Sequence, residues 1–397
     1  MSTPASVLVV GASAAGLSTA EALRRNGYAG SLTVLGAEPH PPYDRPPLSK
    51  QVLAGAWQPE RAHLRPPAML AAVDAEFVLG DPAVALDAPT RTVRTAAGRS
   101  LTADAVVLAT GLAPRTLPGQ DGLAGVHVLR TLDDALALRA ELATASTVVV
   151  VGEGVLAAEI AATTRKLGLA VTMAGPQPAP LAAQLGPFAG DLLAALHAEN
   201  GVTLRLGTAV TGLIADVADG VGRVTGVRLS TGEALPADLV VVAIGAAPVT
   251  GWLADSGLTV DNGVLCDARC HAGYGVWAVG DVARWHREDL GASVRLENRT
   301  NATEQAGVVA ANILGADRAY RPVPYMWTDQ YDAKLQVFGM PSPDDEVRVV
   351  DGAVADRRFV ALYRRAGVVT GVLGWNMPKQ TRLRRQELID AAPIPAV

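Results

Sequence analysis

Two glycine-containing turns in this sequence have the residue types that bind the phosphates of a dinucleotide. GASAAG at residues 11–16 follows the apolar run 7–10, and GEGVLA at residues 152–157 follows the apolar run 148–151. Glycine permits a tight exit from a strand, small side chains let a phosphate approach, and the next helix offers free N–H groups to a pyrophosphate. One such turn is as compatible with a plain tight turn as with a nucleotide site, but two copies favour nucleotide binding. The candidate contacts are Gly11, Ser13, Ala15, Gly16, Gly152 and Gly154.

The two turns belong to a pattern that occurs twice, because VVVVG at 148–152 repeats VLVVG at 7–11. Each copy predicts a strand–turn–helix–strand unit. The unit opens with a buried strand, continues with apolar residues at helical spacing, and ends in a second strand, at residues 32–35 in the first unit. Glu38 follows that second strand, where a carboxylate can accept hydrogen bonds from ribose hydroxyls. The first unit is therefore predicted to bind an adenine dinucleotide.

Further along the chain, two apolar segments, DAVVLATG at 104–111 and ADLVVVAIG at 237–245, each end in a glycine before a proline-bearing loop. We expect the chain to cross between domains at these points. VWAVGD at 276–281 predicts a strand that ends in Gly-Asp, followed by a helix at 304–314. Asp281 is a candidate for binding a ribityl hydroxyl, and capping a helix is its alternative role.

Length and composition predict a globular protein of two or three domains. The chain has 397 residues, of which 49% are hydrophobic and 18% charged, so it can bury large cores. A net charge of -5 argues against a nucleic-acid partner. The N-terminus lacks a signal-peptide pattern and no apolar run approaches the ~20 residues that span a bilayer, so a cytoplasmic protein without membrane contact is expected.

Several longer segments resemble the pyridine-nucleotide-dependent ferredoxin reductases of the glutathione-reductase-like flavoprotein superfamily, the type that serves bacterial oxygenases. The likeness covers essentially the whole chain. The most specific segments are EPHPPYDRPPLSK (38–50), LATGLAPRTLPG (108–119), VWAVGDVARW (276–285), TNATEQA (300–306) and WTDQYDAKLQ (327–336).

The resemblance implies an α/β fold with two Rossmann-like dinucleotide-binding domains, one for FAD and one for NADH or NADPH, and a small α+β C-terminal domain. It also implies an FAD-dependent oxidoreductase. The expected boundaries are 1–110 and 245–320 for a discontinuous FAD domain, 111–244 for the NAD(P) domain and 321–397 for the C-terminal domain.

Three residues are implied in catalysis by the same resemblance. Lys50 would lie beside the flavin ring, where a cation favours the anionic reduced flavin; a surface lysine is the alternative. Glu159 would lie near the nicotinamide, and Trp327 would pack beside the flavin, with a core tryptophan as its alternative. Arg45 and Arg130 would contact the FAD pyrophosphate. The other implied cofactor contacts are Ala109, Thr110, Gly111, Gly245, Gly280, Asp281 at the ribityl chain, Glu297, and Glu304 with Gln305 on the helix that faces the isoalloxazine.

Two departures from the family pattern affect these expectations. The second strand of the second unit ends in Met173-Ala-Gly175 and is followed by PQPAPL, without the acidic residue that suits NADH or the basic residues that suit NADPH. Nucleotide preference and the strength of nucleotide binding therefore stay open. Asn298 and Arg299 replace the usual His-Trp pair before TNA, which alters the flavin environment.

Cysteine usage bears on the chemistry. The chain has only Cys266 and Cys270, and neither lies in the first unit, where thiol-dependent members of the superfamily carry theirs. Buried small residues are favoured over a redox pair, and His271 adds only a third candidate ligand, so no metal site is expected. The flavin itself must then pass electrons on, from NAD(P)H by hydride transfer to a small iron–sulfur protein by single electrons.

A small acidic ferredoxin, of the 2Fe–2S or another type, is the expected partner of a monomer or homodimer. Four cations near the C-terminus form a candidate docking patch, although a solvated helix face is equally compatible: Lys379, Arg382, Arg384 and Arg385. Two other functions stay open. One is direct action on a small metabolite or quinone, and the other is a flavin-bearing interaction or signalling protein.

Overall fold

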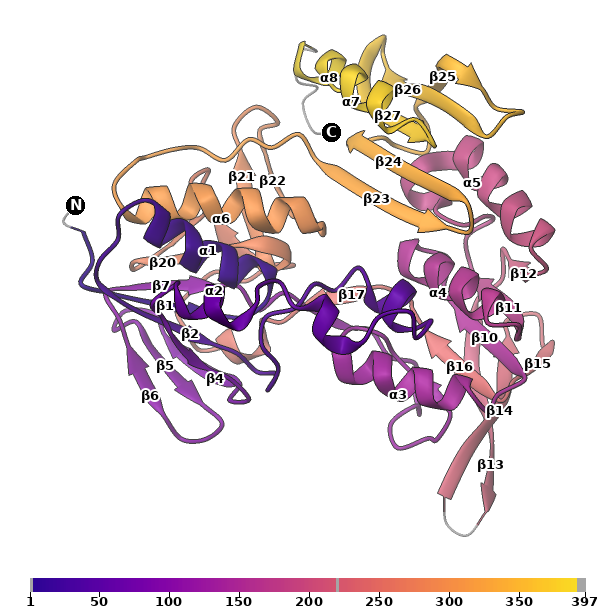
Figure 1. The fold of residues 1–397 in the computed structure, drawn as a ribbon, viewed down its shortest axis with the longest axis horizontal. Coiled ribbons are helices and arrows are strands. Elements are labelled where there is room, and N and C mark those ends of the chain that lie inside the picture. Colours follow the sequence, from indigo (N-terminus) through magenta and orange to yellow (C-terminus); the bar gives the residue numbers. More distant parts are fainter. Residues whose placement is uncertain (1–2, 219–220, 391–397) are drawn as a thin grey trace.

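The protein's structure is a computed structural model that describes residues 3–218 and 221–390. Its N-terminal part is built on a six-stranded sheet with the strand order β19-β20-β7-β1-β2-β3 (Figure 1). The predicted first strand, β1, pairs in parallel with β2 and β7, so the carboxyl ends of all three strands lie at one edge. The bounds are β1 Ser6–Val10, β2 Ser31–Leu35, β3 Glu76–Val78, β7 Ala105–Leu108, β19 His271–Gly273 and β20 Val276–Ala278.

Both faces of this sheet are covered, which explains why residues 7–10 of β1 and all of β7 are apolar and buried. Helices α1 (Ala14–Arg25) and α6 (Arg299–Ile313) lie on one face. The small antiparallel sheet of β4 (Ala83–Asp87), β5 (Thr92–Thr95) and β6 (Ser100–Thr102) lies on the other (Figure 1).

Helix α6 begins at Arg299, ahead of the predicted start at residue 304. The cause is Asn298, whose side chain accepts a hydrogen bond from the N–H of Asn301 at 3.1 Å and caps the helix. The residue that departs from the family pattern therefore has a local structural role.

A second sheet, with the order β12-β11-β10-β16-β9, repeats the plan of the first. Its strand β10 pairs in parallel with β11 and β16, as β1 does with β2 and β7. A three-stranded antiparallel sheet of β13, β14 and β15 extends from this unit (Figure 1). The bounds are β9 Val126–His127, α3 Leu132–Leu142, β10 Thr147–Val151, α4 Val155–Lys166, β11 Ala170–Gly175, α5 Ala182–Glu199, β12 Thr203–Leu206, β13 Val210–Ala218, β14 Val221–Leu229, β15 Ala234–Pro236 and β16 Leu239–Val242.

The two units are joined by an antiparallel pair of short strands, β8 (Leu112–Pro114) and β17 (Ala246–Pro248). These strands directly follow the segments 104–111 and 237–245, so the two expected crossings lie side by side. The domain boundaries themselves stay a prediction.

One segment of the expected FAD domain packs in the core of the second unit. This segment, residues 43–62, contains the short helix Leu48–Val52, and its apolar side chains share a cluster with those of α3 and α4. The buried members are Tyr43, Leu48, Val52, Leu53 and Ala62. The chain therefore passes from the first sheet to the second unit and back before it reaches β7.

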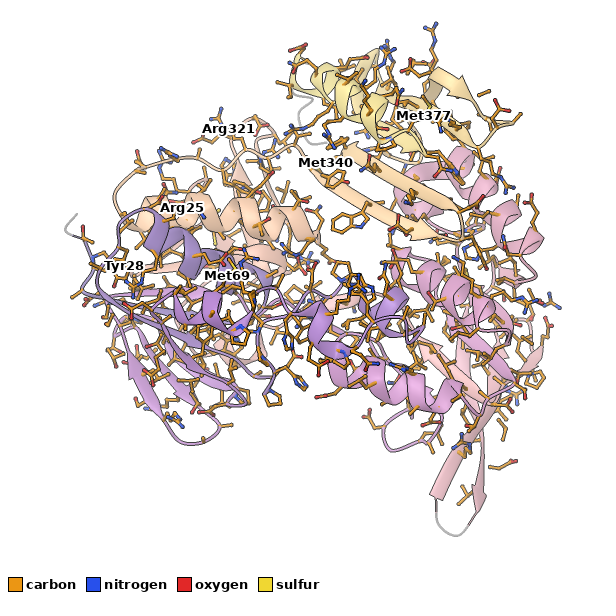
Figure 2. The ribbon with its side chains drawn as sticks, viewed as in Figure 1. Arg25, Tyr28, Met69, Arg321, Met340 and Met377 are labelled. Carbon is orange, nitrogen blue, oxygen red and sulfur yellow. The ribbon has the colours of Figure 1, made fainter. Side chains whose placement is uncertain are left out.

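The C-terminal part is a five-stranded antiparallel sheet with the order β23-β24-β27-β26-β25, followed by two short helices. Figure 2 shows Met340 and Met377 on this sheet unit and Arg321 on the segment that leads to it. The sheet packs on the second unit, where the hydroxyl of Tyr363 donates to the carbonyl of Leu185 at 2.8 Å. The bounds are β23 Tyr325–Gln330, β24 Ala333–Gly339, β25 Glu346–Ala353, β26 Arg358–Arg365, β27 Val368–Trp375, α7 Pro378–Arg384 and α8 Gln386–Asp390.

Among the described residues, no helix is both long and apolar enough to cross a membrane.

Candidate functional site

A large cavity of about 750 Å³ lies where the carboxyl ends of the two parallel sheets and strand β23 meet. Ligand sites in open α/β sheets lie at this edge, outside the carboxyl ends of the strands. Most of the residues expected to contact cofactors line the cavity. They are Gly11, Ser13, Ala15, Glu38, Arg45, Lys50, Ala109, Thr110, Gly111, Arg130, Gly154, Glu159, Gly245, Asp281, Glu297 and Trp327.

The first glycine turn fits a dinucleotide phosphate because its backbone leaves no room for side chains. Gly11 has φ +122°, and a Cβ there would overlap the carbonyl group of Ala109. A Cβ on Gly16 would overlap the carbonyl oxygen of Gly11 and lie 3.2 Å from Val9. The N-terminus of α1, capped by Ser13 without a side-chain hydrogen bond, is thus held against the end of β1.

The second turn has the same geometry. Gly152 has φ +120°, and a Cβ there would overlap the carbonyl oxygen of Ala243. Gly154 caps α4 and has open space where a Cβ would lie. Gly16 and Gly152 do not line the cavity, so they act by allowing close packing of the turn.

Glu38, the predicted ribose ligand, is held by two neighbours. The Arg45 guanidinium donates to Glu38 Oε1 at 2.7 Å, and the hydroxyl of Tyr43 donates to Glu38 Oε2. Arg45 also donates to the hydroxyl of Ser13 in the glycine turn. Burial raises the pKa of Tyr43, Arg45 opposes this shift, and Glu38 adds to it, so this hydroxyl stays a donor. The carboxylate and the cation are both oriented toward the cavity wall.

Arg130 and Asp281 form a second charged pair at the cavity, with 3.5 Å between Nη2 and Oδ2. Burial lowers the pKa of Arg130 and raises that of Asp281, while their mutual attraction opposes both shifts. The Nε of Arg130 is buried and has no hydrogen-bond partner among the described residues. Because an unpaired buried donor is costly, its position on the cavity fits an anionic group such as a phosphate.

Lys50 and Glu159 lie at the centre of the site. The ammonium of Lys50, on the short helix 48–52, donates to Glu159 Oε2 on α4 at 2.6 Å. Their side chains are only 13% and 6% exposed. Ser49 Oγ donates to the same carboxylate oxygen at 2.6 Å, and Thr328 Oγ1 of β23 donates to Oε1 at 2.8 Å. Glu159 is therefore fixed from both the short helix and strand β23.

Behind Glu159 lies a buried polar chain that sequence reasoning missed. Gln330 Nε2 donates to Thr328 Oγ1 at 3.2 Å, and Gln330 Oε1 lies 2.9 Å from His197 Nε2. Burial lowers the pKa of His197, so the ring is neutral and positions Gln330 without adding charge. A signal was present in the sequence, because two-residue periodicity places Thr328 and Gln330 on one face of β23.

Trp327 points to the other face of β23 and lines the cavity, where it stacks on Tyr325 with 5.8 Å between ring centroids. Arg299, one of the departures from the family pattern, also lines the cavity, and its Nε lies 2.6 Å from Asp44 Oδ1. Arg299 thus adds a cation to the cavity wall.

Besides Gly16 and Gly152, three more expected cofactor contacts lie away from the cavity wall: Gly280, Glu304 and Gln305. Glu304 is exposed beside a small separate hollow under Tyr325. Gln305 is fully buried, because its Oε1 accepts from the N–H of Gly280 at 2.7 Å and its Nε2 donates to Cys270 Sγ at 3.1 Å. Gln305 and Gly280 therefore stabilise the turn that carries Asp281. The side chains of Glu304 and Gln305 do not line the cavity, and the expectation that their helix faces the isoalloxazine stays a prediction.

Both cysteines are buried in the core around the six-stranded sheet, outside the segment 7–38 that forms the first strand–turn–helix–strand unit, in agreement with their interpretation as small core residues. Burial raises the pKa of Cys270 to about 12, with Gln305 opposing, and raises that of Cys266. Both groups are neutral thiols at physiological pH. Across the described residues, no group of three or more His, Cys, Asp or Glu side chains is placed to hold a metal ion.

Comparisons with known proteins identify the family of this chain. Residues 5–306 match the family model described as pyridine nucleotide-disulphide oxidoreductase, and residues 325–396 match the reductase C-terminal model. The chain is 35% identical to rhodocoxin reductase of Rhodococcus erythropolis over 98% of this chain and 90% of that protein. It is 34% identical to putidaredoxin reductase of Pseudomonas putida over 98% and 92%, respectively.

Solved structures give the same result. The ferredoxin reductase for the CYP199A2 system from Rhodopseudomonas palustris matches with a TM-score of 0.92 and 33% identity, over 98% of this chain and 97% of that one. The reductase in a covalent putidaredoxin reductase–putidaredoxin complex matches with a TM-score of 0.91 and 33% identity, over 98% and 94%. The predicted α/β fold class, flavoprotein enzyme class and cofactor types are confirmed. The chain belongs to the pyridine nucleotide-disulphide oxidoreductase family, in the group whose members carry the reductase C-terminal domain.

Proposed function

We propose that this protein takes electrons from a reduced nicotinamide nucleotide and delivers them, through FAD, to a small 2Fe–2S ferredoxin that supplies an oxygenase. The observation that carries the proposal is the Lys50–Glu159 ion pair on the wall of one cavity into which both glycine turns open. When bound, FAD accepts a hydride from the nicotinamide and returns its electrons one at a time. One of the matched solved structures is named as a ferredoxin reductase, and another is a complex of putidaredoxin reductase with putidaredoxin.

The residues of this chain supply binding, orientation and charge. The turn at Gly11, with Arg45 and Arg130, binds the FAD pyrophosphate, and Glu38 accepts hydrogen bonds from its ribose. The turn at Gly152 binds the nicotinamide nucleotide. Residues of both turns line one continuous cavity at the carboxyl ends of the two sheets, so the two dinucleotides would share this space when bound.

Lys50 places a positive charge at the meeting point, where it stabilises negative charge that develops during reduction. Glu159 holds the ammonium in position, and the hydroxyls of Ser49 and Thr328 hold Glu159. Trp327 covers the cavity from β23 and limits the access of water. The buried neutral thiols of the first core have no part in this transfer.

The proposal is tested with the FAD-loaded protein and two acceptor systems. We expect NADH or NADPH to reduce the bound flavin, and cytochrome c reduction to depend on an added 2Fe–2S ferredoxin. Flavin absorbance that stays unchanged with both nucleotides would refute the electron donor. Turnover with a small quinone that exceeds ferredoxin-dependent turnover would instead indicate direct reduction of a small molecule. The monomeric or homodimeric state and the cytoplasmic location stay predictions.

A further inference from the structure

The two units can be matched residue by residue through equivalent backbone hydrogen bonds. The N–H of Gly11 donates to the carbonyl of Leu35 at 2.7 Å, and the N–H of Gly152 donates to that of Ala174 at 2.8 Å. Gly11 therefore corresponds to Gly152, and the residues that follow β2 correspond to those at the end of β11.

The same comparison identifies the residue of the second unit that corresponds to Glu38, the proposed ribose ligand of the first unit. The carbonyl of Glu38 accepts from the N–H of Gly80 at 3.0 Å, and the carbonyl of Gln177 accepts from the N–H of Gly207 at 2.8 Å. Both glycines have nearly the same φ, +74° and +76°. Gln177 thus occupies the position of Glu38, and the second unit has no carboxylate there.

The second unit has a carboxylate at a different position of the same site. The residue after the first glycine of the turn is Ala12 in the first unit and Glu153 in the second. In the first unit, a Cβ on Gly36 would lie 2.7 Å from the Cβ of Ala12. In the second unit, a Cβ on Gly175 would overlap Oε2 of Glu153 and lie 3.5 Å from its Oε1.

Glu153 therefore extends from the glycine turn across the end of β11. Its Oε1 accepts a hydrogen bond from the backbone N–H of Gln177 at 3.3 Å. The carboxyl group thus reaches the residue that matches Glu38, and Gly175 supplies the space for it. The side chain is half-buried, and burial raises its pKa while the Gln177 N–H opposes the shift.

We propose that Glu153 supplies, from the turn, the carboxylate that binds the adenosine ribose of the nicotinamide nucleotide, and that it makes NADH the preferred donor. The inference rests on the proposed function. A carboxylate at this place accepts hydrogen bonds from the 2′- and 3′-hydroxyls, as Glu38 is placed to do for FAD. It also repels the 2′-phosphate of NADPH, because two negative charges meet at close range.

The described loop beside Glu153 supplies no cation for a 2′-phosphate. Residues 175–181, GPQPAPL, contain no basic side chain. Arg205 on β12 is in register with Ala174, but its Nε lies 3.1 Å from Glu233 Oε1 and its charge is already paired. The charge distribution thus favours the unphosphorylated nucleotide.

The test compares the two nucleotides within each variant, with ferricyanide as acceptor so that no ferredoxin is needed. The unmodified protein should show the higher kcat/KM with NADH. Glu153→Gln keeps the shape but removes the charge, and should lower the ratio of the NADH to the NADPH value about tenfold. Glu76→Gln, an exposed glutamate on β3, is the matched control and should leave the ratio unchanged.

Direct binding gives a second readout, by calorimetric titration with ADP-ribose and with its 2′-phosphorylated form. Glu153→Gln should narrow the difference between the two affinities. The double variant Glu153→Ala/Gln177→Glu returns the carboxylate to the position of Glu38 and should restore the preference for ADP-ribose. The alternative is that Glu153 only stabilises the 176–181 loop, where the Leu181 N–H donates to the Glu153 carbonyl. In that case, substitution of Glu153 would change the affinities for ADP-ribose and for its 2′-phosphorylated form by the same factor.

Three results would overturn the inference. The first is a preference of the unmodified protein for NADPH, and the second is an unchanged ratio of the NADH to the NADPH kcat/KM in Glu153→Gln. The third is tighter ADP-ribose binding in Glu153→Ala, which would mean that the carboxylate occupies the ribose site. These three results can be distinguished from failure of the proposed electron transfer to a ferredoxin. Loss of ferredoxin-dependent turnover with an intact NADH preference refutes the acceptor and leaves the role of Glu153 standing.

Discussion

The Lys50 ammonium lies 2.6 Å from the Glu159 carboxylate, and this ion pair joins the short helix 48–52 to helix α4. Both side chains are largely buried, so each charge depends on the other for compensation. Ser49 and Thr328 supply the remaining hydrogen bonds to the carboxylate. The pair thus couples the position of a cation to the part of the chain that is proposed to bind the nicotinamide nucleotide.

Replacing Lys50 by Gln should slow flavin reduction by NADH by roughly ten- to hundredfold, because the preorganised positive charge is lost. The midpoint potential of the bound flavin should also become more negative. Stopped-flow absorbance and a redox titration measure the two effects. Lys334→Gln, an exposed lysine on β24, is the control. Equal rates and potentials in the two variants would contradict a role for the Lys50 charge.

The two glycine turns should be separable by mutation. Gly11→Ala forces a Cβ against the Ala109 carbonyl and should abolish FAD binding, whereas Gly152→Ala should retain FAD and lose rapid reduction by nucleotide. Flavin content and reduction rate are measured on each purified variant. Gly307→Ala, in α6 with open space around its Cβ position, serves as the control. Loss of FAD from Gly152→Ala as complete as that from Gly11→Ala would refute the division of labour.

Asp345 should make stability depend on acid pH. Burial would raise its pKa, but hydrogen bonds from Arg365, Thr370 and the Ser342 N–H hold the pKa below its ordinary value. The stabilisation is therefore fully present above the unfolded pKa of about 3.9 and is lost as pH falls through the lower folded value.

Asp345→Asn should accordingly lower the thermal unfolding midpoint at neutral pH, with a loss of about 1–2 kcal/mol. The difference from the unmodified protein should shrink below pH ~4. Circular dichroism melts across this range measure both effects. The exposed neighbour variant Asp344→Asn should melt like the unmodified protein, and identical melts for the two variants would count against the prediction.

The C-terminal cations differ in their freedom to meet a partner. Arg384 is bound to Asp351 at 2.9 Å and to Glu387 at 2.8 Å, and Arg385 lies over the Phe338 ring. Within residues 3–218 and 221–390, Lys379 and Arg382 have no ion pair. The candidate docking patch therefore narrows to these two cations.

Charge reversal at Lys379 and Arg382 should slow ferredoxin reduction at low ionic strength and spare ferricyanide reduction, because steering acts only on a charged protein partner. Arg384→Glu should instead lower the melting temperature, because it breaks two ion pairs. The rates of ferredoxin reduction and of ferricyanide reduction are measured in parallel for the unmodified protein and for the variants. A double reversal that slows both acceptors equally would refute docking at this patch.

Local patterns made much of the fold predictable. The repeat of the 7–11 pattern at 148–152 identified both glycine turns. This was possible because each apolar strand is followed directly by the glycine, Gly11 or Gly152, whose positive φ the turn requires. The early start of α6 was missed because the Asn298 cap depends on one side-chain hydrogen bond.

Contacts between distant residues could not be read from the sequence. Thr328 and Glu159 meet although they lie on different domains of the expected division, and Gln305 is turned away from the cavity by Gly280 and Cys270. The sequence directly after Met173 contains no charged residue that could bind the nucleotide ribose or its phosphate. The carboxylate that reaches this strand end comes from Glu153, on the turn before α4. Periodicity gives the face on which a residue lies, but only packing gives the neighbour that it meets.

The passage of residues 43–62 through the core of the second unit limits how far the two sheets can swing apart. Such a movement would have to withdraw Leu48, Val52 and Leu53, each at most 2% exposed, into water. At about 1.5–3 kcal/mol for each of these side chains, wide hinge opening would cost roughly 5 kcal/mol or more. We therefore expect dinucleotides to enter a preformed cleft without wide separation of the two sheets. Local movements of loops should suffice for their release.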